Sequence, residues 1–352
     1  MGRRIAVLAS GGVDSTLALH LLAERGEGEL VAYYLKIWLE DELAFLGHCP
    51  WKEDLEIIEH ECRRLEVPLE VVPLQQAYRR RVVQYALAEL AAGRTPSSDV
   101  LCNSTIKFGA FLKHLGDRFD LVASGHYART RQDGDDVRLL RGADPVKDQT
   151  YFLCRLRQEQ LRRCVFPIGH LHKREVRQLA RQRRLANAER KDSQGVCFLG
   201  KIPYDEFVAF HLGEKPGLIV EQGSGRVLGR HRGLWFHTIG QRRGLGLGDG
   251  PWYVVDKNLA DNAVVVAHGR DLQSYQRRSF RVDDVNWIAG KPRRGRLLVR
   301  IRHGERLWPA RVELHDDRGL RVQLDEGDPG IAAGQFAVFY DGDECLGGGP
   351  IA

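Results

Sequence analysis

The chain has 352 residues, of which 43% are hydrophobic and 28% charged, and its formal net charge is +6. This length allows two or three domains, each with its own core. There is no run of eighteen apolar residues and no long apolar stretch at the N-terminus, so we expect a cytoplasmic protein with no membrane partner. The seven cysteines include no Cys-x-x-Cys pair. This pattern fits neither a secreted disulfide framework nor a zinc knuckle, and no metal site is expected from it.

Short apolar strands alternate with longer helical patterns from the start of the chain to about residue 128. We expect strands at 5–9, 30–38, 69–72 and 121–124, and helices at 15–23, 52–65, 78–92 and 106–115. This alternation predicts a doubly wound α/β domain with a parallel sheet. In such a sheet the ligand binds at the carboxyl ends of the strands.

The first strand runs directly into a Ser-Gly-Gly-Val-Asp-Ser loop, residues 10–15, which opens the first helix. Two adjacent glycines let backbone N–H groups converge on one anion, and the helix N-terminus adds a partial positive charge. No Lys follows the glycines, so this is not the loop of the common nucleotide triphosphatases. It resembles the pyrophosphatase-type loop of enzymes that cleave ATP between the α and β phosphates. The alternative is a tight strand-to-helix turn that binds nothing.

The basic character of the chain is concentrated between residues 155 and 191, where twelve Lys or Arg stand against three acids. We expect helices at 158–164 and 173–184, with Arg177, Arg181 and Arg184 on one face of the second helix. Such a stripe suits a polyanion with spaced phosphates. The alternative is a solvated helix face, which is a common setting for a charge run.

The last third of the chain changes in character. A glycine-rich stretch at 235–250 is followed by short strand patterns at 252–255 and 263–267, which indicate a small α+β domain. Beyond residue 275 only strand patterns remain, at 296–302, 310–314, 320–324 and 336–340, and these predict a β-barrel of a kind often used to contact RNA. We therefore expect domains at 1–205, 206–272 and 273–352.

Two cysteines stand in contexts that favour reactivity. Cys102 comes just before the helix expected to start near Thr105, where the helix dipole would stabilise a thiolate, and Asp99 precedes it by three residues. Cys197 lies in a polar loop beside Lys191. We expect both thiols to be accessible. The alternative for each is the role of a small buried hydrophobic residue.

Together these motifs resemble the tRNA-specific 2-thiouridylase family along essentially the whole chain. The matching segments include 10–15, 93–103, 106–108, 124–127, 139–142, 147–153, 191–198, 237–246, 252–257, 337–340 and 345–349. The resemblance implies ATP-dependent adenylation of C2 of the wobble uridine, with Mg²⁺, and sulfur transfer from a persulfide on Cys197. It implies that Cys102 is the nucleophile, that Asp99 is an acid or base, and that a Cys102–Cys197 disulfide closes the cycle. It also implies a partner that supplies sulfur, either a cysteine desulfurase or a sulfur-relay protein.

The resemblance also assigns binding residues. For ATP they are Leu8, Ala9, Ser10, Gly11, Gly12, Val13, Asp14, Ser15, Leu35 and Gly125. For tRNA they are Ser97, Ser98, Asp99, His126, Lys147, Asp148, Gln149, Arg302, His303 and Gln335.

The chain departs from the family pattern at the cradle of the target base, where Ser97-Ser98 replaces the usual Asn-Pro. Three alternatives remain open. A relative of another mechanism would hold an iron–sulfur cluster on Asp99, Cys102 and Cys197. An amide ligase built on the same ATP loop would need neither cysteine. A non-catalytic RNA-binding protein would use only the basic segment and the barrel.

Overall fold

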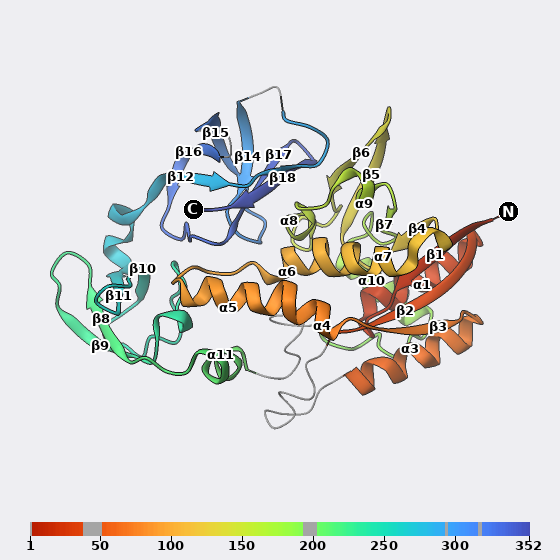
Figure 1. Ribbon diagram of the computed structural model, residues 1–352, viewed down its shortest axis with the longest axis horizontal. Helices are drawn as coiled ribbons and strands as arrows, with labels where there is room; N and C mark the ends of the chain where they lie inside the picture. The colour runs from red at the N-terminus through yellow and green to blue at the C-terminus, as the bar shows by residue number, and fades with distance from the viewer. Residues whose placement is uncertain (1, 38–50, 193–202, 293–294, 316–318) are drawn as a thin grey trace.

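The computed structural model describes residues 2–37, 51–192, 203–292, 295–315 and 319–352 (Figure 1). No helix within these ranges is both long and apolar enough to span a bilayer.

The N-terminal region is built on a five-stranded parallel sheet, as the alternating pattern predicts. Its strand order is β3-β2-β1-β4-β7, and every neighbouring pair is parallel. The bounds are β1 Arg3–Leu8, β2 Gly28–Lys36, β3 Leu69–Pro73, β4 Leu121–Ala123 and β7 Cys164–Val165. The expected helix at 158–164 is shorter, because α9 ends at Leu161 and the chain then enters β7.

Helices cover both faces of this sheet. Ile5 and Val7 of β1 pack with helices α1 (Val13–Arg25) and α3 (Trp51–Leu65). Ala6 and Leu8, which point to the opposite face, pack with the helical run 98–115. Alternate side chains of β1 therefore belong to two hydrophobic clusters, one on each face of the sheet. Helices on both faces of a parallel sheet confirm the doubly wound α/β class.

Two long helical runs on the second face contain π-helical sections. The first consists of α4 (Gln75–Tyr78), η2 (Arg79–Val83) and α5 (Gln84–Ala91). The second consists of α6 (Ser98–Leu101), η3 (Cys102–Ala110) and α7 (Phe111–Leu115), followed by the 3₁₀ turn η4 (Gly116–Arg118). The second run therefore begins at Ser98, and the helix start expected near Thr105 is wrong.

The basic segment 155–191 contains α9 (Gln158–Leu161) and α10 (Lys173–Gln182). Arg184 lies beyond the end of α10 with φ 52°. It therefore does not share a helix face with Arg177 and Arg181, and that expectation is wrong.

The small central region pairs one helix with a four-stranded sheet of order β10-β11-β8-β9. Its elements are α11 Tyr204–Leu212, β8 Gly217–Glu221, β9 Val227–His231, η5 Leu234–Phe236, β10 Trp252–Asn258, β11 Ala263–His268 and η6 Gly269–Tyr275. This agrees with the α+β class expected for it.

The C-terminal strands form an antiparallel, barrel-like sheet of order β12-β16-β15-β14-β17-β18-β6-β5, with β13 paired to β18. The bounds are β12 Arg277–Asp283, β13 Asn286–Trp287, β14 Arg296–Arg300, β15 Trp308–Leu314, β16 Gly319–Asp328, β17 Phe336–Asp341 and β18 Glu344–Pro350. A bridge between Val282 and Ile351 draws the first strand toward the last residues of the chain.

Two strands of this sheet come from far earlier in the chain. The hairpin of β5 (Ala128–Asp133) and β6 (Asp136–Arg141) pairs with β18, where Glu344 and Cys345 lie opposite Leu140 and Leu139. A short helix, α8 (Thr150–Leu153), follows the hairpin, and Thr150 and Tyr151 bond across to β17. The N-terminal and C-terminal regions therefore share a sheet and a hydrophobic core.

Candidate active site

The loop at residues 10–15 lies at the carboxyl end of β1, as its sequence predicts. Gly11 has φ 76°, and a Cβ at this position would lie 2.8 Å from the backbone of Asp54. Ser15 accepts a hydrogen bond from the Ser10 N–H (3.1 Å) and donates one to the Gly12 carbonyl (3.0 Å). The loop is thus held in a compact turn at the N-terminus of α1, which is a geometry suited to an anion.

Gly125 packs directly against this loop. A Cβ at Gly125 would lie 2.6 Å from the Ser15 nitrogen, so only glycine fits this contact. Leu35 lies at the carboxyl end of β2, the strand next to β1. The structure therefore gathers the residues assigned to ATP at one edge of the sheet: Leu8, Ala9, Ser10, Gly11, Gly12, Val13, Asp14, Ser15, Leu35 and Gly125.

Residues from later in the chain hold the carbonyl side of the loop. Asn187 donates to the Gly11 carbonyl (2.9 Å) and to the Thr16 hydroxyl (2.9 Å). Arg190 also donates to the Gly11 carbonyl (3.2 Å) and forms an ion pair with Asp54 (2.6 Å). These hydrogen bonds hold the Gly11 carbonyl in place, so that its oxygen does not compete with an anion for the N–H groups of the loop.

Asp14 is the centre of an ionic network that sequence reasoning missed. Lys173 lies 2.8 Å from both Asp14 carboxylate oxygens, and the Tyr127 hydroxyl donates to one of them (2.7 Å). Burial and the negative charge of Asp14 raise the pKa of Tyr127. Since 159 residues separate Asp14 from Lys173, no local spacing could have revealed this contact.

Lys173 also bonds Asp192, the last residue described before the segment that contains Cys197. Asp192 receives Lys173 (2.8 Å), Lys147 (2.7 Å) and Arg177 (2.7 Å). Burial of this carboxylate raises its pKa, but hydrogen bonds from Lys147 and Lys173 outweigh burial and lower the pKa to about 2. Lys173 therefore links Asp14 of the loop at residues 10–15 to Asp192. Cys197 itself lies outside the described residues.

Cys102 occupies an interior site. It is the first residue of η3 and only 1% exposed, so the expected helix N-terminus and the expected accessibility of this thiol are both wrong. Burial raises the pKa of Cys102 to about 11; the positive charge of Lys107 opposes this shift and Asp99 adds to it. As the structure stands, the thiol is protonated at neutral pH.

Lys107 was missed because its spacing from Cys102 is wrong for an α-helix. Residues five apart lie about 140° apart around an α-helix. In a π-helix the hydrogen bonds run from i to i+5, which brings such residues to the same side. The Phe111 N–H accordingly donates to the Ile106 carbonyl.

Asp99 has a carboxylate oxygen, Oδ1, that is buried and has no hydrogen-bond partner among the described residues. A buried, unpartnered carboxylate oxygen is costly, so it points to a group that arrives from outside the chain. Burial lowers the pKa of His303, and the negative charge of Asp99 is among the smaller effects that oppose this shift.

The residues assigned to tRNA fall into two groups. Ser97 bonds the Gly334 carbonyl (3.5 Å), Ser98 opens α6, and His303 stacks on Phe152 with ring centroids 4.5 Å apart. Together with Gln335, which follows Gly334, these residues gather around Asp99 at the junction of the first and last regions. Arg302, next to His303, is held by two hydrogen bonds to Asp328 (2.9 and 2.7 Å).

The second group lies deeper in the molecule. Asp148 is 1% exposed and forms an ion pair with Arg300 (2.5 Å), and Gln149 accepts from the Tyr127 N–H (3.0 Å). His126 is 8% exposed and lies 2.8 Å from the Ser124 hydroxyl; burial lowers its pKa well below the ordinary value. Lys147 is engaged by Asp192. Direct RNA contact stays a prediction for the residues of both groups.

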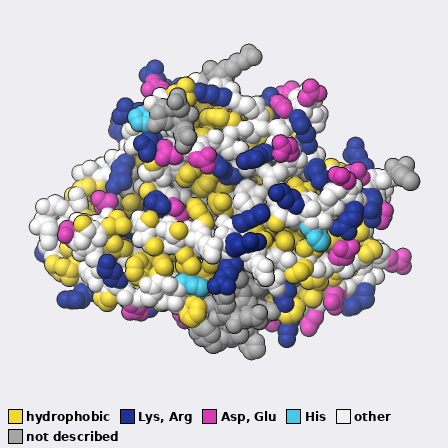
Figure 2. All heavy atoms as spheres, viewed as in Figure 1, with side chains coloured by type: hydrophobic (Ala, Val, Ile, Leu, Met, Phe, Trp, Pro, Cys, Tyr) yellow, Lys and Arg dark blue, Asp and Glu magenta, His cyan; other side chains and the backbone are white. Residues whose placement is uncertain are grey.

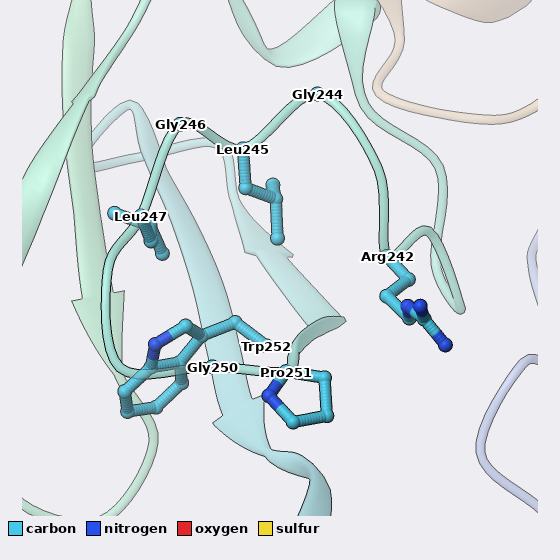
Figure 3. Close-up of a pocket in the computed structure, with 8 residues that line it drawn as sticks. All are labelled: Arg242, Gly244, Leu245, Gly246, Leu247, Gly250, Pro251 and Trp252. Atoms are coloured by element: carbon cyan, nitrogen blue, oxygen red, sulfur yellow. The ribbon is translucent and has the colours of Figure 1, made fainter.

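A cavity of about 330 Å³ lies elsewhere, under the glycine-rich loop of the central region (Figure 3). None of the residues assigned from the sequence lines it. Its lining is Arg242, Gly244, Leu245, Gly246, Leu247, Gly250, Pro251 and Trp252.

Three family models match successive parts of the chain. They are described as a tRNA methyl transferase HUP domain (residues 3–201), a tRNA methyl transferase PRC-barrel domain (205–268) and an aminomethyltransferase beta-barrel domain (277–351).

Two curated relatives match over nearly their full length. The tRNA-specific 2-thiouridylase MnmA 2 of Bacteroides fragilis is 46% identical over 354 residues, covering 99% of each chain. The tRNA-specific 2-thiouridylase MnmA of Parabacteroides distasonis is 42% identical, covering 99% of this chain and 98% of its own. Among solved structures, the U34-tRNA thiolase NcsA from Methanococcus maripaludis, with its [4Fe-4S] cluster, matches 59% of this chain and 64% of its own, at 15% identity and TM-score 0.36. On the strength of the two full-length matches, this chain belongs to the tRNA-specific 2-thiouridylase family.

Proposed function

We propose that this protein is a tRNA uridine 2-sulfurtransferase. It adenylates C2 of the wobble uridine (position 34) with ATP and replaces the activated oxygen by sulfur, and it releases AMP and pyrophosphate. The observation that carries the proposal is the joint placement of two features in one domain. A turn built for an anion lies at the end of β1, and a helical run with Asp99 and Cys102 packs on the same sheet.

ATP would bind along the residues gathered at the loop, with its phosphates at the N-terminus of α1. Gly11 with its positive φ and Gly125 with its close backbone contact support this, because each lets the loop keep its compact turn where a side chain would collide with neighbouring backbone. Mg²⁺ would bind beside the phosphates and would neutralise charge on the leaving pyrophosphate. Asp14, whose carboxylate is bonded to Lys173 and Tyr127 in this structure, would serve as a ligand only when Lys173 releases it.

Activation is needed because the C2 oxygen of uridine is a poor leaving group until AMP is attached to it. The sulfur comes from a persulfide on Cys197. In one order of events, the Cys102 thiolate attacks the inner sulfur of that persulfide and expels hydrosulfide, which displaces AMP from C2. In the other order, the terminal persulfide sulfur displaces AMP first, and Cys102 then releases the thiolated base. Both orders leave a Cys102–Cys197 disulfide, which an external thiol must reduce.

Asp99 would exchange a proton with the target base or with Cys102. Its unpartnered Oδ1 and its position one helical turn before Cys102 support this role. Because Cys102 is buried, we infer that RNA binding opens the contacts around η3 before sulfur transfer.

The sulfur on Cys197 must be loaded by another protein, either a cysteine desulfurase or a sulfur-relay carrier, and the reaction belongs in the cytoplasm, where its tRNA substrate is found. An iron–sulfur cluster on Asp99, Cys102 and Cys197 is the competing mechanism. Analysis for iron and acid-labile sulfide in anaerobically purified protein distinguishes the two, because the persulfide mechanism predicts neither in stoichiometric amount.

The direct test of the ATP chemistry is product analysis. Protein, ATP, Mg²⁺ and unmodified tRNA should yield AMP and pyrophosphate, because attack occurs at the α-phosphate. ADP and phosphate as the only products would refute the proposal. An amide ligase on the same loop would also release AMP, but replacing either Cys102 or Cys197 would leave its turnover unchanged.

A further inference from the structure

More than half of the cations of the basic segment 155–191 are neutralised by acids, some near them in the sequence and others far away. Seven of its twelve Lys and Arg residues form ion pairs with carboxylates. Arg181, for example, pairs with Glu189 (2.7 Å), and Arg183 pairs with Glu24 (2.7 Å). A paired cation has less to gain from a phosphate, because its present partner must first be released. The structure therefore favours the solvated-face interpretation of this segment.

A different run of cations lies next to η3, the π-helical section that begins at Cys102. Arg79, Arg80 and Arg81 are consecutive, and all three are exposed on η2. Within the described ranges, no carboxylate lies within ion-pair distance of Arg80 or Arg81. Their positive charge therefore remains available to a polyanion.

Arg81 places this run beside Cys102. Its guanidinium donates to the Thr105 carbonyl (2.8 Å), three residues after Cys102 on η3. On the inner side, Val82 and Val83 of the same π-turn pack in one hydrophobic cluster with Cys102. Figure 2 shows Lys and Arg side chains gathered in the middle of this face, over the two helical runs of the second face of the sheet.

We propose that Arg80 and Arg81 bind backbone phosphates of the tRNA next to the target uridine. The proposal rests on the proposed function and adds to it a docking surface for the RNA. Arginine suits this role because its planar fork of donors matches phosphate oxygens. RNA held there would lie across η2 and η3. The packing between these two elements must open before a base can reach the buried Cys102. Phosphate contacts carry no sequence information, so this surface orients the RNA without selecting the base.

The test compares two double variants that remove the same charge. Arg80→Ala/Arg81→Ala should lower tRNA affinity about tenfold or more near 0.1 M salt and flatten the plot of log K against log[salt] by about 1.4 to 1.8, the value for two lost phosphate contacts. The control, Arg181→Ala/Arg183→Ala, removes two paired cations of the basic segment and should change the slope by less than about 0.5. Filter binding of full-length protein to unmodified tRNA across a salt series measures both.

Two further variants keep the result interpretable if loss of the Arg81–Thr105 bond disturbs η3. Arg80→Ala alone should flatten the slope by about half as much as the double Ala variant. Arg80→Lys/Arg81→Lys should keep most of the wild-type slope, since a lysine still releases counterions.

An unchanged slope in the Arg80/Arg81 double variant overturns the inference. If the slope is unchanged but the variant can no longer be loaded with sulfur, the inference is also overturned. The surface would then be assigned to an acidic sulfur-donor protein. The proposed function is judged separately: it fails if the wild-type protein binds tRNA but forms no 2-thiouridine.

Discussion

At the scale of single residues, Cys102 and Asp192 show how surroundings set chemistry. Cys102 is enclosed in a hydrophobic cluster, and burial raises the pKa of its thiol to about 11. A protonated thiol is a poor nucleophile. The helix must therefore move, or an incoming group must replace the present contacts, before the thiolate forms.

Replacing Cys102 by Ser should abolish formation of 2-thiouridine, because a serine hydroxyl cannot attack a persulfide under these conditions, while ATP and tRNA affinities should stay within about twofold of wild type. Cys62→Ser is the matched control, because Cys62 is also buried and burial raises its pKa to about 11. Nucleoside mass spectrometry after a single-turnover reaction measures the product. Normal thiolation by Cys102→Ser would remove Cys102 from the mechanism.

Asp192 should stabilise the fold above about pH 4 and lose that effect on acidification. Its folded-state pKa of about 2 lies below the usual value of 3.8, so the contribution is complete above pH 4 and disappears as pH falls toward 2. Asp192→Asn should cost about 2 kcal/mol at pH 7 and much less near pH 2. Urea unfolding at both pH values measures the difference, and an equal cost at the two would contradict the ion-pair account.

The loop at residues 10–15 and the short spacing between Asp99 and Cys102 could be recognised from the sequence, because each motif is local. The Asp14–Lys173–Asp192 network could not, since its members are brought together only by the fold. The same applies to the burial of Asp148, which pairs with an arginine 152 residues away.

At the scale of elements, the strands were easier to predict than the helix starts. The apolar runs of β1 and β2 coincide closely with the expected strands, because buried parallel strands are continuously hydrophobic. The edge strand β3 is mostly exposed but also lies close to its expected bounds. The run at 98–115 began seven residues earlier than expected, and its π-helical section has a period that no α-helical pattern anticipates. That error misplaced Cys102 at a helix end.

Gly125 is the residue on which the contact between the β4 loop and α1 depends. A Cβ there would lie 2.6 Å from the Ser15 nitrogen and 2.7 Å from the Asp14 carbonyl carbon, both backbone atoms that cannot give way cheaply. Gly125→Ala should therefore weaken ATP binding about tenfold or more by displacing the start of α1. Gly248→Ala is the control, because no atom lies within 4 Å of its Cβ position. Calorimetric titration with ATP decides, and equal affinities for the two variants would disprove the contact.

At the scale of the whole molecule, the first and last regions are interlocked. The hairpin β5–β6 completes the C-terminal sheet, and the Thr95 N–H donates to the Ala333 carbonyl (2.8 Å) beside the Ser97–Asp99 segment. Lys257 of the central region donates to the Gly93 carbonyl (3.0 Å). The sequence predicted three successive regions, but strand pairing between residues two hundred apart leaves no local signal, so the shared sheet was not foreseen.

The buried Arg300–Asp148 pair should be a principal link between these regions. Arg300→Met leaves Asp148 buried without its cation and should cost about 3–5 kcal/mol. Adding Asp148→Asn should recover part of that loss. Arg296→Met, on the same strand but exposed and paired with Asp325, should cost less than about 1 kcal/mol. Urea denaturation compares the three, and a loss for Arg300→Met as small as that for Arg296→Met would contradict the structural role.

The central claim is that this chain places sulfur on C2 of the wobble uridine at the expense of ATP. The most direct measurement is mass spectrometry of nucleosides from unmodified tRNA incubated with the full-length protein, ATP, Mg²⁺ and a cysteine desulfurase with cysteine as sulfur source. We predict 2-thiouridine at position 34, one AMP per sulfur inserted, and no product when ATP is omitted. Unmodified uridine at that position in every reaction, with the protein folded and bound to tRNA, would contradict the account.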